Sequence, residues 1–288
     1  MSRTVRVAAL QLPPAQGQSF SEIRGSNIAN ALAYIREAGR RGTDIACLPE
    51  MFASYGLPLG MPSEGCCDTV PGEVLDQIAH AARRNRMYVI APLAATVDGV
   101  LRNTAVILDR SGALMGQYFK THLTQPELDA GFVPGDDLPV FQLDFGRIGI
   151  MTCLDSMFPE VARVLAVRGA EIIFFPHVQS GYGEVGWVAQ LMSRAIDNAL
   201  HIVPVSFGVG ESESWMPGQI MGRSGVVGPD GIWLASGGRQ AAVVTTAVDL
   251  DRPRRVRCYG VIGEADFREQ TFARRRPELY AALVEQQR

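Results

Sequence analysis

The feature that most constrains this chain is a series of short runs in which apolar residues occupy consecutive positions. Successive side chains of a strand point to opposite faces, so a strand that is apolar at every position must be covered on both faces. We predict strands at Val5–Leu10, Asp44–Leu48, Met87–Leu93, Thr104–Leu108, Val140–Leu143, Arg147–Thr152, Glu171–Phe175 and His201–Ser206. The pattern therefore predicts sheets that are buried between other layers.

Helical patterns separate several of these strands. We predict helices at Asn27–Arg40, Pro71–Asn85, Pro159–Arg168 and Glu184–Leu200, with a proline at the first position of the second and third. Strand, helix and strand then alternate, which is typical of an α/β architecture. Hairpin turns at Arg110–Gly112 and Pro229–Gly231 add antiparallel pairs, so we expect mixed sheets. Because no linker or repeat interrupts the pattern, we expect one domain.

Composition limits the classes of function. With 47% hydrophobic and 20% charged residues, the chain of 288 residues is globular. Its net charge of −3 provides no field that would recruit nucleic acid or an anionic membrane. The apolar runs are too short to span a membrane, and Val7–Leu10 is too short for the core of a signal peptide. Five cysteines without framework spacing favour a reduced, cytoplasmic location.

Cys153 follows a predicted strand directly, and a helix opens soon after at Pro159. The thiol is therefore expected at a strand end and close to a helix N-terminus. The partial positive charge of the helix and a nearby lysine would lower the pKa of the thiol toward the nucleophilic thiolate. The alternative is an unreactive packed thiol, since free cysteine is among the most buried residue types.

Glu50 and Lys120 also stand at strand ends. Pro49 cannot donate to a sheet ladder, so it ends the strand before Glu50. A carboxylate there serves as a general base if burial raises its pKa, whereas a solvated loop glutamate is the alternative. Lys120 ends a hairpin strand, where a cation stabilises a thiolate or an oxyanion, although such a lysine commonly extends to solvent.

Glutamate, lysine and cysteine in this order, each at a strand end, resemble the nitrilase (carbon–nitrogen hydrolase) superfamily, in particular its amidase- and carbamoylase-like members. The resemblance covers nearly the whole chain. The segments similar to successive family motifs are Val7–Gln11, Leu48–Glu50, Lys120–Leu123, Pro134–Asp136 with Val140-Phe141, Cys153–Asp155, Phe158–Glu160, Trp187, Arg194-Ala195, Asn198, Gly222 with Ser224, and Arg276–Tyr280.

This resemblance implies a four-layer α-β-β-α sandwich with two mixed β-sheets, formed by a single carbon–nitrogen hydrolase domain over residues 1–288. It implies Glu50 as base, Lys120 as oxyanion stabiliser and Cys153 as nucleophile, with Glu127 as a second glutamate that positions the substrate. Members of the family usually dimerise so that the sandwich continues across the interface. A homodimer or higher homo-oligomer is therefore expected.

Two features depart from the family pattern. The spacing from Glu127 to Pro134 is one residue longer, and Leu154 replaces the aromatic residue that usually follows the nucleophile. The second departure puts in doubt any substrate that needs a ring there. We include Leu154, His177 and Trp187 among the expected substrate-binding residues, because His177 and Trp187 follow the strand beside Cys153. Ordinary packing is the alternative for both.

No metal site is expected, because the four histidines, His122 and His177 among them, lack metal-ligand spacing. Hydrolysis through a thioester needs no cofactor, so none is expected. The glycine-containing segment Ser54–Asp68 is expected to be either a lid over the site or an ordered surface loop.

The sequence therefore predicts a cysteine hydrolase that uses water to cleave a linear amide or an N-carbamoyl (ureido) compound through a thioester. The resemblance favours an amide, because amide-cleaving members usually have aspartate where Asp155 stands. The alternatives are a nitrilase acting on a C≡N group and a non-catalytic binding protein with the same fold.

Overall fold

The computed structural model describes residues 3–15, 17–59, 66–179, 181–210, 216–251, 268 and 272–285. The described strands form two mixed sheets. The first contains β1 (Thr4–Gln11), β2 (Ile45–Cys47), β3 (Asp68–Val70), β4 (Tyr88–Val97), β5 (Val100–Leu108), β6 (Leu114–Phe119) and β13 (Ala242–Asp249), in the order β13-β1-β2-β4-β5-β6 with β3 paired to β4. The second contains β7 (Val140–Gln142), β8 (Arg147–Ile150), β9 (Ile172–Pro176), β10 (His201–Val205), β11 (Gly225–Val227) and β12 (Trp233–Ser236), in the order β12-β11-β10-β9-β8-β7.

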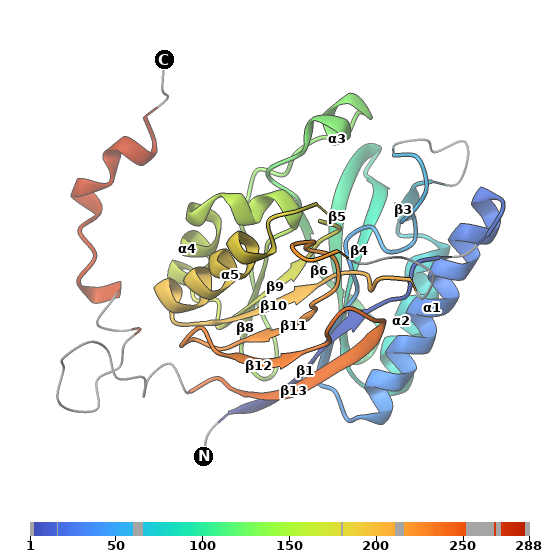
Figure 1. The fold of residues 1–288 in the computed structure, drawn as a ribbon, viewed down its shortest axis with the longest axis horizontal. Helices are drawn as coiled ribbons and strands as arrows, with labels where there is room; N and C mark the ends of the chain where they lie inside the picture. The colour runs from blue at the N-terminus through green and yellow to red at the C-terminus, as the bar shows by residue number, and fades with distance from the viewer. Residues whose placement is uncertain are drawn as a thin grey trace.

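Helices cover the outer face of each sheet (Figure 1). The first sheet carries α1 (Phe20–Arg40) and α2 (Glu73–Asn85), and the second carries α4 (Pro159–Val167) and α5 (Glu184–Asn198). The other helical segments are α3 (Gln125–Asp129) and short 3-10 helices at Cys153–Met157, Pro277–Leu279 and Ala281–Leu283.

Alternating side chains of single strands enter different cores. In β1, Ala8 and Leu10 pack against α1 and α2, whereas Val7 and Ala9 face the second sheet. In β9 the residues on one face join the core between the two sheets, and those on the other, Ile173 and Phe175, pack with α4 and α5. The predicted two-sided burial is confirmed, and the three apolar cores separate the four layers of an α-β-β-α sandwich.

Several predicted boundaries were wrong. The first helix begins at Phe20 rather than Asn27, because Ser19 and Glu22 form a capping box there. The second begins at Glu73 with Gly72 as its N-cap, so Pro71 lies outside it. The sequence did not predict β3 or β13, and the β4–β5 hairpin is longer than predicted because it closes through a two-residue turn, Asp98-Gly99, in which both residues have positive φ.

The strand directions bring several loops to one edge. In the first sheet β2, β4 and β6 point the same way, and in the second β8, β9 and β10 do so. In open α/β sheets, ligands commonly bind outside the carboxyl ends of the strands. The residues that follow β2, β6, β8 and β9 form the candidate site.

Candidate active site

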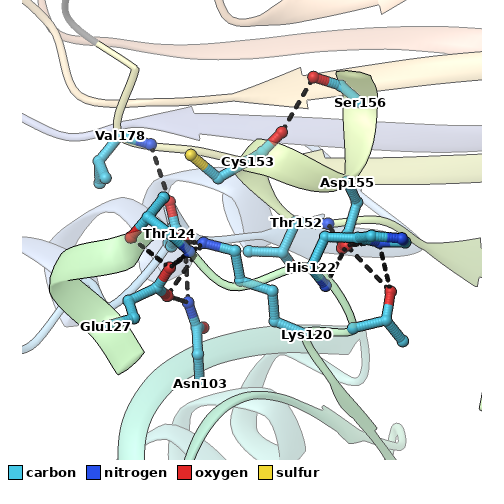
Figure 2. Close-up of polar contacts among 12 residues, drawn as sticks. Asn103, Lys120, His122, Thr124, Glu127, Thr152, Cys153, Asp155, Ser156 and Val178 are labelled. Atoms are coloured by element: carbon cyan, nitrogen blue, oxygen red, sulfur yellow. Dashed lines mark hydrogen bonds and ion pairs between the residues drawn. The ribbon is translucent and has the colours of Figure 1, made fainter. Parts of the chain in front are cut away.

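The structure brings Glu50, Lys120 and Cys153 together from both sheets. Figure 2 shows Lys120 and Cys153 with their neighbours. Glu50 follows β2 and Lys120 follows β6 in the first sheet, whereas Cys153 follows β8 in the second. All three side chains are buried, with Cys153 9% exposed and the other two less. The site is therefore divided between the sheets, with Glu50 and Lys120 on one side and Cys153 on the other.

The Cys153 turn has an unusual backbone conformation. Cys153 opens a 3-10 helix with φ of 47°, a region that residues other than glycine rarely adopt. Met51, directly after Glu50, has φ of 48°. Residues held in this region cost free energy and persist where the surrounding structure determines them, often at functional sites. In the Cys153 turn the Ser156 hydroxyl donates to the Cys153 carbonyl at 2.9 Å.

The ammonium group of Lys120 lies between two carboxylates. Its Nζ donates to Glu50 Oε1 at 2.9 Å and to Glu127 Oε1 and Oε2 at 2.9 and 2.8 Å. Thr124 donates to Glu127 Oε2 through its backbone N–H and its hydroxyl, both at 2.8 Å. Because the protein already engages both oxygens of Glu127, its observed contacts serve to hold Lys120. Its predicted role in positioning the substrate remains a prediction.

Asn103 on β5 joins the two carboxylates, and the sequence did not indicate it. Its buried Nδ2 donates to Glu50 Oε1 at 2.8 Å and to Glu127 Oε1 at 2.7 Å. The other oxygen of Glu50 accepts a hydrogen bond from the backbone N–H of Val178, after β9, at 3.1 Å. The available signal for Asn103 was its polar side chain in a strand whose later residues are apolar. Val178 contributes only main chain, so its side chain carries no signal.

The pKa values in this cluster follow from burial and charge. Burial alone would lower the pKa of Lys120, but the charges of Glu50 and Glu127 and the hydrogen bond with Glu127 outweigh it and raise that pKa. Burial would likewise raise the pKa of Glu127, but Lys120 and the hydrogen bonds from Asn103 and Thr124 hold it below its ordinary value. Lys120 is therefore cationic and Glu127 anionic throughout the neutral range.

The expectation of a lowered thiol pKa at Cys153 was wrong. Burial, the charge of Glu50 and a hydrogen bond with Glu50 raise this pKa, and they outweigh Lys120 and the Val178 N–H, which lower it. The surrounding carboxylates already exceed the single lysine in charge, so a thiolate would add a further buried negative charge. At rest the Cys153 side chain is therefore a neutral thiol beside a carboxylate that can accept its proton.

Leu154 contributes its main chain to the site. Among the described residues, its backbone N–H, which directly follows Cys153, makes no hydrogen bond. Its side chain is half-buried. A free N–H at this position is available to a developing oxyanion. The predicted contact between the Leu154 side chain and substrate remains a prediction.

His177 and Trp187 lie beside the site within the core. His177 is fully buried, its ring stacks on Phe175 with centroids 4.9 Å apart, and Trp187 lies 5.2 Å from it. Burial lowers the pKa of His177 to about 3, so the ring is neutral near neutral pH. Trp187 belongs to the core between the second sheet and α4 and α5. These contacts are those of packing, and a role in binding substrate remains a prediction for both residues.

The segment after Glu50 is packed where the structure describes it. Phe52 and Ala53 are fully buried, and Asn27 donates to the carbonyls of Ala53 and Tyr55 at 3.2 and 2.9 Å. The Tyr55 ring stacks on Phe207 with centroids 3.8 Å apart. Residues 51–57 thus form an ordered turn. The rest of the expected lid-or-loop segment includes residues 60–65, which lie outside the described residues.

Within the described ranges, no three His, Cys, Asp or Glu side chains gather closely enough to hold a metal ion. In the same ranges, no helix combines the length and apolar character needed to cross a bilayer.

The chain and its fold are similar to those of known proteins. The chain is 29% identical to Omega-amidase NIT2 of Homo sapiens, with 96% of each chain covered. Its fold matches a carbon-nitrogen hydrolase of Helicobacter pylori with a TM-score of 0.81 and 24% identity, covering 99% of each chain. It also matches a variant of the amidase from Nesterenkonia sp. AN1 whose active-site cysteine carries the acetamide moiety of fluoroacetamide, with a TM-score of 0.77, 22% identity, and 98% of this chain and 97% of that chain covered.

The sequence model of the carbon-nitrogen hydrolase family matches residues 6–257, which include Glu50, Lys120 and Cys153 and both sheets. That range is far more than half of the chain. This protein therefore belongs to the carbon–nitrogen hydrolase family.

Proposed function

We propose that this protein hydrolyses small linear amides with Cys153 as nucleophile, Glu50 as general base and Lys120 as oxyanion stabiliser. The observation that carries the proposal is the neutral, buried thiol of Cys153 in contact with Glu50, whose carboxylate also accepts from Lys120. A nucleophile, an adjacent base and a fixed cation are the groups that acyl transfer requires.

In the first half-reaction Glu50 takes the thiol proton while Sγ attacks the amide carbonyl carbon. The carbonyl π electrons move to oxygen, and the oxyanion is held by the Lys120 ammonium and the Leu154 N–H. The tetrahedral intermediate then collapses to a thioester. The C–N bond breaks as Glu50 returns its proton to the departing nitrogen, so ammonia or an amine leaves.

In the second half-reaction Glu50 removes a proton from water, which attacks the thioester carbonyl. Collapse of this second intermediate breaks the C–S bond, and the proton on Glu50 returns to sulfur. The products are a carboxylic acid and the resting thiol. Each proton that Glu50 takes is returned, and the donors at Lys120, Asn103 and Val178 hold its carboxylate throughout.

The substrate class within the family is also a proposal. Support for an amide comes from the relative called Omega-amidase, since the activity in that name is amide hydrolysis. We retain N-carbamoyl compounds, because their ureido carbonyl presents the same carbon and oxygen to Cys153. The test is a panel assay of ammonia release from aliphatic amides, ω-amides, ureido acids and nitriles. Failure of the whole panel under conditions in which the protein is folded would favour the non-catalytic binding protein.

We expect matched pairs of amide and nitrile to show a higher kcat/KM for the amide, by about tenfold or more. A tetrahedral amide intermediate bears an oxyanion, which Lys120 and the Leu154 N–H suit. A nitrile instead passes through a thioimidate nitrogen that needs a proton donor. The measurement is kcat/KM for each pair with the same carbon skeleton. A consistent advantage for the nitrile would establish the rival nitrilase activity.

Replacing Glu127 with glutamine should lower kcat by about tenfold or more. The change turns one acceptor oxygen into an NH₂ donor, which then faces a donor of Lys120, Asn103 or Thr124. Lys120 is misplaced as a result. Steady-state kinetics on the best amide of the panel provide the measurement. Glu160→Gln on the exposed first turn of α4 is the control and should leave kcat unchanged. Wild-type kcat in Glu127→Gln would remove Glu127 from the catalytic machinery.

We further propose that the chain forms one domain and acts as a homodimer in the cytoplasm. Pairing of β1 with β13 along their whole lengths supports the single domain, since it joins distant parts of the chain. A subunit interface beside the site and along α4 and α5 is supported by apolar side chains that are exposed in these places, among them Met157, Phe158, Val167 and Val185. The free cysteines Cys47 and Cys153 support a reducing compartment.

A further inference from the structure

Asp155 lies two residues after the nucleophile, but its side chain does not face the Glu50–Lys120–Glu127 cluster. It is fully buried and points into the loop that follows β6 (Figure 2). Its Oδ2 accepts from the Tyr118 hydroxyl at 2.5 Å and from the Thr152 N–H at 2.7 Å. Its Oδ1 accepts from the Thr121 hydroxyl, the His122 N–H and His122 Nδ1 at 3.0, 3.0 and 2.9 Å.

These donors belong to two segments that carry different members of the triad. Tyr118, Thr121 and His122 surround Lys120 in the chain, and Thr152 directly precedes Cys153. The segment around Lys120 is otherwise tied to its own sheet, since the Lys120 N–H donates to the Asn103 carbonyl at 2.9 Å. The segment around Cys153 is tied to the other sheet, where the Met151 N–H donates to the Phe174 carbonyl at 3.1 Å.

Asp155 therefore links the two halves of the divided site. A second contact between these segments is the stacking of His122 on Phe158, with ring centroids 3.9 Å apart. Burial and the charge of Asp155 also raise the pKa of Tyr118, which keeps its hydroxyl protonated as a donor. A carboxylate that accepts from every one of these groups fixes their relative positions more closely than apolar packing does.

We propose that Asp155 is a positioning residue that sets the placement of Lys120 relative to the Cys153 thiol by joining the loop after β6 to the nucleophile turn. The inference rests on the proposed catalytic roles of Lys120 and Cys153. It explains how a site divided between two sheets keeps its geometry, and it assigns Asp155 no contact with substrate.

Asp155→Asn is a sharp test because each carboxylate oxygen accepts from a backbone N–H, Thr152 at Oδ2 and His122 at Oδ1. A backbone N–H cannot become an acceptor. Whichever way the asparagine turns, its NH₂ group therefore faces another donor. We expect kcat to fall by about 100-fold and KM to stay within about threefold, because the geometry of the chemistry changes and the binding of substrate does not.

A second readout does not depend on turnover. Lys120 lowers the pKa of the Cys153 thiol, so moving Lys120 away raises that pKa further. We expect iodoacetamide at pH 8 to alkylate Cys153 about tenfold more slowly in Asp155→Asn than in the wild type, as followed by mass spectrometry of the Cys153 peptide. The alkylation measurement separates the proposed function from the positioning role of Asp155. A wild type without amidase activity would refute the proposed function. The alkylation rates would still test the positioning role.

The matched control is Asp68→Asn, which breaks another buried aspartate contact, the ion pair with Arg24, without touching either segment. It should lower Tm while leaving kcat and alkylation within about twofold of the wild type. A folded Asp155→Asn with wild-type kcat and alkylation rate would overturn the proposal, as would a raised KM with unchanged kcat.

If Asp155→Asn does not fold, Tyr118→Phe and Thr121→Val each remove one donor. A several-fold loss of kcat in each supports the link, and wild-type kcat in both overturns it.

Discussion

Replacing Cys153 with alanine should give a folded protein whose amide turnover is at least about 10⁴-fold below that of the wild type. Alanine keeps the strand end and adopts the positive φ of Cys153 at much the same cost, so only the nucleophile is lost. The Lys120 cluster does not depend on the thiol for its hydrogen bonds. Substrate therefore meets a formed site without an attacking atom. Ammonia release gives the rate, and thermal unfolding confirms the fold.

Cys67→Ala is the matched control, since Cys67 is a half-buried cysteine outside the cluster of Glu50, Lys120 and Cys153. It should retain wild-type turnover, and so should single replacements of Cys47, Cys66 and Cys258, the last of which lies outside the described residues. Wild-type turnover in Cys153→Ala would refute covalent catalysis by this residue.

Glu50→Gln and Lys120→Ala should each lower kcat by about two orders of magnitude or more. Glutamine preserves the size of Glu50 but cannot accept the thiol proton, and its NH₂ group faces either Lys120 and Asn103 or the Val178 N–H. Removal of Lys120 eliminates the oxyanion donor and leaves Glu50 and Glu127 buried without their shared cation. We therefore expect Lys120→Ala also to lower Tm.

Glu171→Gln provides the control for loss of an ion-paired glutamate. Glu171 precedes β9 at the opposite edge of the sheet and pairs with Arg3 at 2.7 Å, far along the strand from the loops of the site. Its kcat should stay within about twofold of the wild type. An enzyme with Glu50→Gln that kept kcat within the same range would remove the general-base assignment.

The layers were predictable from sequence because burial on both faces leaves a local signal. Residues such as Ala8 and Val7 are neighbours in the chain yet enter different cores, and the continuous apolar runs record that fact directly. The start of α1 was missed because the residues before Asn27 carry too few apolar side chains to show helical periodicity. The capping box at Ser19 and Glu22 was the readable signal there.

The sequence predicted which three residues meet in the candidate site, but it did not predict the contacts that support them. Glu50, Lys120 and Cys153 are marked by strand ends and by order along the chain, but Asn103 reaches both glutamates only through the pairing of β5 with its neighbours. The direction of the Cys153 pKa shift was wrong for a similar reason. A helix end and a lysine are local features, whereas burial and the approach of Glu50 arise from packing of the two sheets.

The division of the site between two sheets has a consequence for how this chain folds. Glu50 and Cys153 are separated by most of the first sheet and by the strands that start the second, so their contact closes a long loop. Contacts distant in sequence form slowly, because the entropy of loop closure is lost before the contact stabilises the chain. A collapsed intermediate with either sheet alone has no competent active site. Catalytic activity therefore reports the docking of the two sheets rather than the formation of secondary structure, and its recovery marks the end of folding.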